Sequence, residues 1–526
     1  MVAVLICLVA IVVLVAFANR IGVAYPIVLV LGGMALGFVP HIPAVPFPPS
    51  LVLVVFLPPL LYWESVTSPT SEFRSNALWI FQLAFGLVIV TTVAVACVAH
   101  AIVPGMSWGV AFVLGAIVSS TDELAFASVA DRLNVPRHII GTIEGESLIN
   151  DATSLILYGI GIAAVVGATF SFEHAAWSLV LSVAEALAIG LAAGGLAVLA
   201  WRAVKDDNLQ GAISIVVPFL AYLPAYYIGA SGVLAVVTTG IFVNRYTPNV
   251  LRPRARELIT GFWVTVVFIV NAFIFVAVGI NFHGILGRIT DISGGHLVWY
   301  AVAVAATCIV VRVAWVFAQG LLPATNEPEH VDGEADWSHV AILSWTGMRG
   351  GVSLAAALAI PLATAAGPFP DRDLVIFLTF GVLLATLVGQ GGTLPALIRA
   401  LHVKDDGADE EEERVALAAT ASVALARLDE FERNDTVPAP VLALLRKRFV
   451  AQEHEFGAAG DDAAHPMRLY RQALCTVLEA QRHEVVRLRG EGRIDNTVFR
   501  RIQRLLDLET ARMELLGTTG QSDIEG

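Results

Sequence analysis

Long apolar stretches separated by short polar segments fill the chain up to about residue 400. A window of about 20 residues, the length with which a helix crosses a bilayer, selects thirteen candidate spans. These are residues 2–18, 25–39, 51–67, 77–103, 107–130, 139–166, 175–201, 209–229, 231–243, 259–282, 296–322, 339–363 and 374–399. The pattern predicts an all-α polytopic membrane protein, and a composition with 57% hydrophobic and 15% charged residues agrees with it.

The distribution of Lys and Arg between the connecting loops predicts the orientation of these spans. With the N-terminus outside, two basic residues, Arg288 and Arg372, lie in outer loops. Twelve lie on the inner side: Arg20, Arg74, Arg132, Arg137, Arg202, Lys205, Arg245, Arg252, Arg254, Arg256, Arg399 and Lys404. We therefore expect a multi-pass protein of the cell membrane with an outer N-terminus and a cytoplasmic C-terminus. The four cysteines lie far apart and predict no disulfide framework and no metal site.

The composition changes abruptly after Lys404, where the acidic run DDGADEEEER begins. Beyond this run the apolar positions recur with helical spacing. We predict a transmembrane domain over 1–403, an acidic linker over 404–413 and a small cytosolic helical domain, with a regulatory role, over 414–526. Of the net charge of −13, −5 lies up to Lys404 and −8 beyond it, so neither part is expected to bind nucleic acid.

The span at 139–166 carries carboxylates that are unusual at membrane depth, where each costs roughly 2.5–3.5 kcal/mol. At helical spacing Ser147 and Asp151 share one face, while Glu146 and Asn150 share the face beside it. Hydroxyl and carboxylate oxygens suit a small hard cation such as sodium. Asp151 can also bind a proton, because desolvation favours the neutral acid. One site that takes either ion in turn is the minimum requirement for an exchanger.

Two other interpretations of this span are open. The polar groups can serve only to join helices through hydrogen bonds. A hydrolase is disfavoured, because Gly145-Glu146-Ser147-Leu148-Ile149 lacks the second glycine of a nucleophile elbow.

Two further spans contain polar or glycine-rich centres that predict broken helices. Span five holds Ser119-Ser120-Thr121-Asp122-Glu123, and span twelve holds Thr346-Gly347-Met348-Arg349-Gly350-Gly351-Val352-Ser353. They are the fifth members of two six-span halves, 1–6 and 8–13, as an inverted repeat requires. Because Arg349 stays charged, it needs an anion, and we predict that it pairs with Glu146.

Span three contains Pro58-Pro59, which must interrupt the hydrogen bonding of its helix. Glu64 follows near the inner end. It either extends to water or takes part in function.

Together these residues resemble the NhaP/NHE type of sodium/proton antiporters, in the first cation:proton antiporter family. The matching elements are Phe56–Leu61, Thr121-Asp122, Gly145–Asp151, Ser231-Gly232-Val233-Leu234-Ala235 and Met348–Leu354. The resemblance implies two inverted six-helix repeats with two crossing broken helices, a moving core domain and a homodimer. It implies an ion site made by Asp151, Ser147, Asp122 and the backbone of Thr121, with Asn150 nearby and Glu146 and Arg349 as a buried structural pair.

The chain departs from the family pattern at Glu123, where the family usually has proline. We expect Glu123, Glu144 and Glu64 to modulate the site. Related electrogenic antiporters have an aspartate where this chain has Asn150, so the resemblance implies electroneutral exchange of one cation for one proton.

The predicted function is sodium/proton antiport with a role in pH homeostasis, with no enzymatic activity and no cofactor. The alternatives are a potassium/proton antiporter of the same fold, a non-transporting sensor that gates the tail, and a channel.

Overall fold

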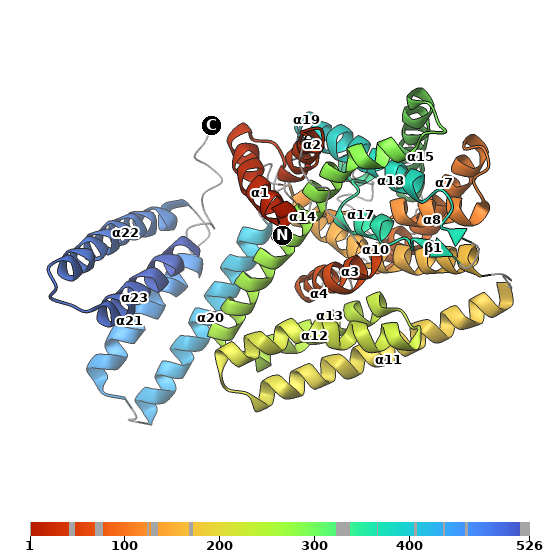
Figure 1. The fold of residues 1–526 in the computed structure, drawn as a ribbon. Helices are drawn as coiled ribbons and strands as arrows, with labels where there is room; N and C mark the ends of the chain where they lie inside the picture. The colour runs from red at the N-terminus through yellow and green to blue at the C-terminus, as the bar shows by residue number, and fades with distance from the viewer. Residues whose placement is uncertain are drawn as a thin grey trace. The chain divides into compact units, whose positions relative to one another are not determined.

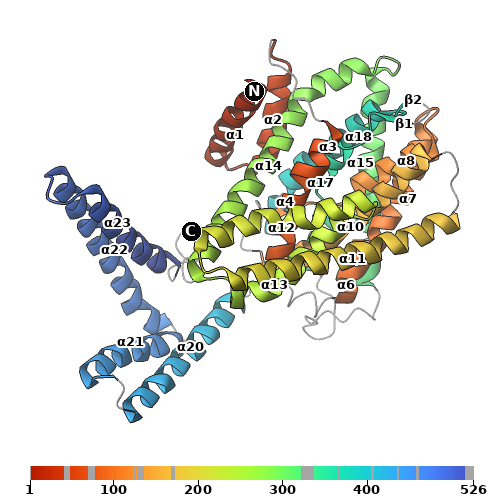
Figure 2. The ribbon, with the colours of Figure 1, turned by 60° about the horizontal axis from the view of Figure 1, so that its bottom comes forward.

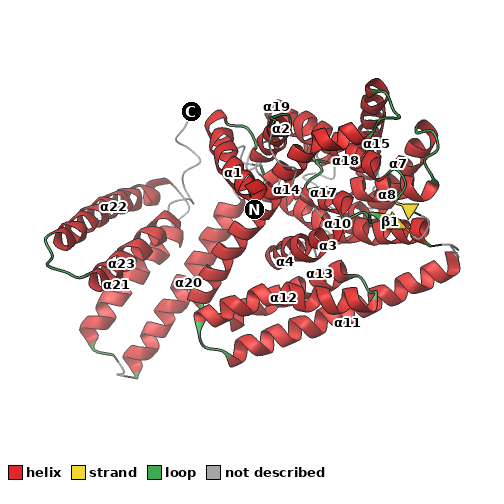
Figure 3. Ribbon diagram, viewed as in Figure 1, coloured by secondary structure: helices red, strands yellow, loops and turns green. Residues whose placement is uncertain are grey.

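The computed structural model describes residues 2–40, 48–68, 77–123, 126–127, 135–167, 172–321, 337–364, 367–403, 408–434, 437–457 and 461–515. The chain forms two compact units, Met1–Lys404 and Asp405–Gly526. Within the described ranges nearly all regular structure is helical (Figure 3). The exception is a two-stranded hairpin of β1 (Ala363–Thr364) and β2 (Gly367–Pro368), in which Ala363 pairs with Pro368.

Eight helical stretches of the described chain are long and apolar enough to cross a membrane. They are α1 (Val2–Ile21), α6–η2–α7 (Ala77–Phe81, Gln82–Leu87 and Val88–Ile102), α10 (Arg137–Val166), α11 (Phe172–Ala203), α12 (Asp207–Ile228), α14 (Pro253–Arg288), α15 (Gly294–Gly320) and α18–η3–α19 (Arg372–Leu384, Ala385–Gln390 and Gly391–Ala400). The prediction of a helical polytopic membrane protein is confirmed at this level.

The remaining helices of the first unit are shorter or interrupted. They are α2 (Tyr25–Gly37), α3–η1–α4 (Pro49–Leu51, Val52–Phe56 and Leu57–Thr67), α8 (Trp108–Ser119), α13 (Gly232–Val250), α16 (Trp337–Trp345) and α17 (Gly351–Leu358). Each of the thirteen predicted spans contains at least one helix. The count of thirteen crossings and the inverted repeat stay predictions.

The first unit is built from two groups of helices that pack within themselves (Figures 1 and 2). Group A comprises α1–α4 and α11–α14; group B comprises α6–α8, α10 and α15–α19. In group A the backbones of α2 and α14 touch directly. A Cβ at Gly33 would lie 2.6 Å from the carbonyl oxygen of Val276, and one at Gly279 would lie 2.7 Å from the nitrogen of Met34. The two groups meet where α10, α17, α18 and η3 pack against helices of group A.

The double proline lies where the helical hydrogen bonding changes. Pro58 and Pro59 are in the first turn of α4, and the chain runs into this turn from η1 with helical backbone at Phe56 and Leu57. The segment directly before α4, η1, is π-helical, so the usual α-helical hydrogen bonding is absent there. Such segments occur often near functional sites, and Glu64 lies further along α4.

Both polar centres interrupt their helices. α8 ends at Ser119, and Ser120 has extended backbone with φ −70° and ψ 141°. α16 ends at Trp345 and α17 begins at Gly351. The two non-helical segments are joined where the N–H of Asp122 donates to the carbonyl of Met348 at 2.8 Å. The broken helices therefore cross at this point, on the side of group B that faces group A.

The second unit consists of α20 (Ala408–Arg433), α21 (Ala439–Gly457), α22 (Asp461–Gly490) and α23 (Asn496–Leu515). It forms two helical hairpins, α20–α21 and α22–α23. A small apolar core of Leu478, Val485, Phe499 and Leu506 joins α22 to α23. Because α20 begins at Ala408, the later part of the predicted linker 404–413 is helical; residues 404–407 lie outside the described part.

Candidate ion-binding site at the helix crossing

The face of α10 that carries Ser147 and Asp151 lies against the break of α8. The hydroxyl of Ser120 donates to Oδ1 of Asp151 at 2.5 Å, and the hydroxyl of Ser147 donates to the carbonyl of Thr121 at 3.0 Å. Asp151 is 3% exposed. The spacing of four residues on α10 thus aims both side chains at one non-helical segment.

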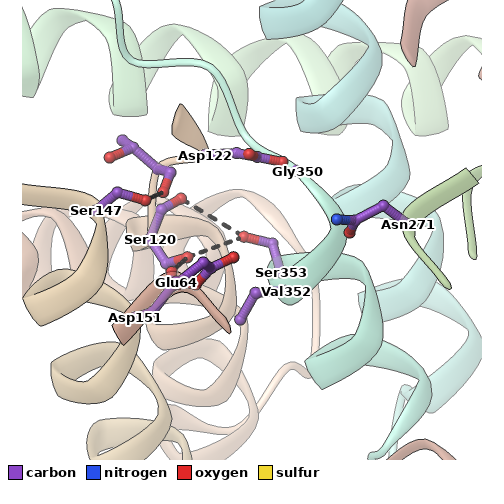
Figure 4. Close-up of a pocket in the computed structure, with 10 residues that line it drawn as sticks. Glu64, Ser120, Asp122, Ser147, Asp151, Asn271, Gly350, Val352 and Ser353 are labelled. Carbon is purple, nitrogen blue, oxygen red and sulfur yellow. Dashed lines mark hydrogen bonds between the residues drawn. The ribbon is translucent and has the colours of Figure 1, made fainter. Parts of the chain in front are cut away.

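A polar cavity of ≈ 250 Å³, its mouth included, lies at the crossing (Figure 4). Its lining is Glu64, Ser120, Thr121, Asp122, Ser147, Asp151, Asn271, Gly350, Val352 and Ser353. Glu64 on α4 and Asn271 on α14 come from group A, and the others come from group B. The cavity therefore lies at the boundary between the two groups.

Asp122 is fastened to the start of α17. Its Oδ2 accepts a hydrogen bond from the N–H of Gly351 at 3.2 Å, at the helix end where a negative charge is favoured. A Cβ at Gly350 would overlap the Asp122 carboxylate, so this position requires glycine. The predicted weakening of span twelve by glycine thus also provides room for a carboxylate from span five.

The second stripe of α10, Glu146 and Asn150, contacts the hydroxyl of Thr121. Asn150 Nδ2 donates to Thr121 Oγ1 at 2.6 Å, and this hydroxyl donates to Glu146 Oε1 at 3.3 Å. Glu146 and Asn150 do not line the cavity. Thr121 therefore ties this stripe to the break of α8, with its carbonyl oxygen held by Ser147 on the other side.

The predicted pairing of Glu146 with Arg349 is wrong. Within the described residues the salt bridge of Glu146 is made by Arg312 of α15, whose NH1 and NH2 donate to Oε1 at 2.5 Å and to Oε2 at 2.9 Å. Arg349 instead donates from Nε to the carbonyl of Val118 at 2.8 Å and from NH1 to the carbonyl of Gly347. The carbonyls at the interrupted end of α8 attract a positive charge, which is why Arg349 needs no carboxylate.

The three carboxylates predicted as modulators lie in different places. Glu64 lines the cavity, and its Oε2 is buried without a hydrogen-bond partner in the described part of the chain. Glu123 is half-buried directly after the break, and Glu144 is half-buried on α10. Neither of these two lines the cavity.

Sequence reasoning gave no role to Ser120, Ser353, Arg312 or Asn271. Ser120 and Ser353 lie within the two polar segments that it singled out, so their hydroxyls were available as candidates. Arg312 was recognisable as a second arginine inside an apolar span. Asn271 is one amide within an otherwise apolar stretch, and only the packing of α14 against α17 reveals its position.

Most of the polar side chains that line the cavity offer oxygen atoms, which a small hard cation prefers. Two carboxylates of group B, Asp122 and Asp151, reach it together with Glu64 of group A. The carboxyl group of Asp151 has the chemistry to hold a proton or to act as a ligand of a cation.

Comparison with known proteins decides the class. A sequence model described as the transmembrane part of sodium/hydrogen exchangers matches residues 5–400. The chain belongs to the sodium/hydrogen exchanger family. The resemblance to NhaP-type cation:proton antiporters is thereby confirmed, and family and fold support cation/proton antiport as the activity of this exchanger.

Relatives match most of the exchanger. It is 35% identical over 515 residues to an uncharacterized Na⁺/H⁺ exchanger of Mycobacterium bovis, covering 96% of this chain and 94% of that one. It is 32% identical over 364 residues to a sodium, potassium, lithium and rubidium/H⁺ antiporter of Bacillus pumilus, covering 66% and 54% of the two chains. The solved structure of the sodium proton antiporter MjNhaP1 from Methanocaldococcus jannaschii has the same fold, with a TM-score of 0.60 and 16% identity over 76% of this chain and 99% of that one.

Proposed function

We propose that this exchanger is a Na⁺/H⁺ antiporter in which Asp151 carries the cation and the proton in turn. The observation that supports this most strongly is the burial of Asp151 in an oxygen-lined cavity at the crossing of two broken helices. A cation and a proton that compete for one carboxylate cannot occupy it together, so each crossing of the loaded site carries one of them.

The neighbouring residues have separate tasks in this proposal. Asp122 stays ionised and attracts the cation, because the N–H of Gly351 and the start of α17 stabilise its negative charge. Ser147 holds the carbonyl of Thr121 in place beside the site. Asn150 cannot titrate, so one proton exchanges for one monovalent cation and no net charge moves.

Alternating access follows from the position of the cavity between the groups. When group B moves against group A, the crossing and its ion move with it, and the exposed side of the cavity changes. We further propose a homodimer in the cell membrane, with the N-terminus outside and the second unit in the cytosol as a regulatory domain.

The decisive test is proton-coupled sodium flux in proteoliposomes with Asp151→Asn. The variant is isosteric and removes a buried charge, so it should insert, fold and fail to exchange. Asp371→Asn, the same change outside the spans, serves as the control and should exchange at the wild-type rate. Wild-type exchange by Asp151→Asn would overturn the assignment.

The nature of the cation needs its own measurement. The relative from Bacillus pumilus is named for sodium, potassium, lithium and rubidium, so potassium/proton antiport is the second candidate. Exchange assays with each cation separate the two. Absence of flux with every cation would favour the alternative of a non-transporting sensor.

A further inference from the structure

Asn271 is an amide in the long apolar helix α14, and it is 3% exposed. It faces the cavity from group A, opposite the residues that α8, α10 and α17 supply (Figure 4). Its Nδ2 is buried and has no hydrogen-bond partner among the described residues. Because buried amides are almost always paired, the missing partner should be something that enters the cavity.

The oxygen of the amide lies against the backbone of α17. A Cβ at Gly351 would overlap Asn271 Oδ1, and the N–H of Gly351 is the group that donates to Asp122. The side chain therefore stands at the start of α17, next to the segment that carries the Asp122 carboxylate. Figure 4 shows its nitrogen on the side that faces Ser353.

The contents of the cavity alternate in an exchanger, and so do their bonding requirements. A bound cation needs oxygen ligands, whereas a cation-free carboxylate or a water molecule needs hydrogen-bond donors. An amide offers an acceptor oxygen and a donor nitrogen, and a half turn about its last side-chain bond exchanges them. Glu64, the other residue of group A at the cavity, offers only oxygens while it is ionised.

We propose that Asn271 is a specificity-determining residue of the ion site, contributed by the group against which the site moves. Its oxygen takes one coordination position of a partly dehydrated monovalent cation, and its nitrogen donates into the cavity when the cation is absent. This inference rests on the proposed function, because it assigns a ligand to the same site. It predicts that Asn271 controls the affinity and choice of cation more than the maximal rate.

The test is the dependence of exchange on the concentrations of Na⁺, Li⁺ and K⁺ in proteoliposomes. Asn271→Ala removes one ligand, and the half-saturating Na⁺ concentration should rise about five- to tenfold, with the maximal rate changing less than about twofold. The ratio of half-saturating concentrations for Na⁺ and K⁺ should change as well, because the lost ligand contributes unequally to ions of different size.

Asn271→Asp keeps the shape of the side chain and is the second variant, to be measured if the alanine variant does not fold. Its added negative charge should lower the half-saturating Na⁺ concentration and move the pH profile to more alkaline values, since a proton then leaves the site less readily. A purely structural role would alter neither quantity.

Asn244→Ala is the matched control. Asn244 is a half-buried amide of α13 in the same group, but it donates to the carbonyl of Ser68 at 2.9 Å and does not line the cavity. This variant should lose stability and keep the wild-type half-saturating concentrations.

The inference is overturned if the Asn271 variants keep the wild-type half-saturation for all three cations and the wild-type pH profile. It is also overturned if Asn244→Ala shifts cation affinity to the same extent. Failure of the proposed function itself would appear differently, as continued exchange by Asp151→Asn.

Discussion

Arg312 holds the carboxylate of Glu146 through two hydrogen bonds, from NH1 to Oε1 at 2.5 Å and from NH2 to Oε2 at 2.9 Å, and both side chains are almost completely buried. The pair joins α15 to α10, where Glu146 directly precedes Ser147 of the proposed ion site. Removing one partner leaves the other charge uncompensated, which typically costs about 3–5 kcal/mol.

We therefore predict that Glu146→Ala and Arg312→Ala each lower the thermal unfolding midpoint, and that the double variant loses less than the sum. Thermal unfolding in detergent or nanodiscs measures this coupling. The double variant Glu146→Ala/Arg349→Ala is the control and should show weaker coupling, because Arg349 makes its hydrogen bonds to the carbonyl oxygens of Val118 and Gly347. Strong coupling there, and none between 146 and 312, would contradict the structure.

The close approach of Gly350 to Asp122 leads to a second prediction. In Gly350→Ala the new methyl group and the Asp122 carboxylate cannot both keep their places. A displacement of about 1 Å at a site of this kind can lower the rate about 100-fold. Gly389→Ala adds a methyl group in open space on η3 and should exchange normally in the same proteoliposome assay. Equal rates for the two variants would show that the position of Asp122 is unimportant for transport.

Asn150 allows a test of stoichiometry. With an amide at 150 we expect the steady rate of exchange to be insensitive to a potassium/valinomycin diffusion potential. Asn150→Asp adds a second titrating group beside the site, and its exchange should become voltage-dependent, because two protons can then load against one cation.

Asn244→Asp, which places a carboxylate away from the cavity, is the control and should remain insensitive to voltage. Voltage dependence of the wild type would mean that another carboxylate is coupled. Glu123, next to Asp122 and in place of the family proline, would be the first to examine through Glu123→Gln.

Asp371 lies just before α18, and we expect it to make the stability of the folded protein depend on pH. Its backbone is left-handed, with φ 52° and ψ 20°, and partial desolvation raises the pKa of its carboxyl group, although the residue is exposed. The folded protein then binds a proton more tightly than the unfolded chain, whose aspartates titrate near about 3.9. Its contribution to stability therefore falls as pH rises from about 4 through the raised pKa, and stays lower above it.

Asp371→Asn should remove this decrease, so its unfolding midpoint should match the wild type near pH 4 and exceed it at pH 7. Asp371→Gly should be more stable at both pH values, because glycine also removes the cost of the left-handed backbone, which is roughly 1–2 kcal/mol for a residue with a Cβ. Parallel pH curves for all three proteins would show that the charge of Asp371 does not matter.

The positions within each helix could be derived from the sequence because helical geometry is local. The spacing of Ser147 and Asp151 predicted a shared face, and the polar and glycine-rich centres predicted the end of α8 and the break between α16 and α17. These inferences need only the period of the helix and the cost of polar groups in an apolar span.

The contacts between helices could not be derived in the same way. Two arginines, Arg312 and Arg349, lie inside apolar spans and could pair with Glu146. The sequence does not show which of the two is near it. The packing of the helices decides the pairing. Arg349 donates to the carbonyl of Val118, and Arg312 pairs with the carboxylate of Glu146. Asn271 could not be predicted as a site residue for the same reason, since only the packing of α17 against α14 places it at the cavity.

The pair of Arg312 and Glu146 also has a consequence for biogenesis, because 166 residues separate the two in sequence. At a synthesis rate of about 5–20 residues per second, Glu146 emerges from the ribosome roughly 8–33 seconds before its partner. During that interval α10 must enter the membrane with an unpaired acid, either protonated or still in contact with water. In a Glu146→Cys variant, a nascent chain arrested before α15 should therefore leave position 146 open to a water-soluble thiol reagent. Completion of α15 should protect this position. The order of the helices in the sequence thus sets how long Glu146 stays without its partner during synthesis.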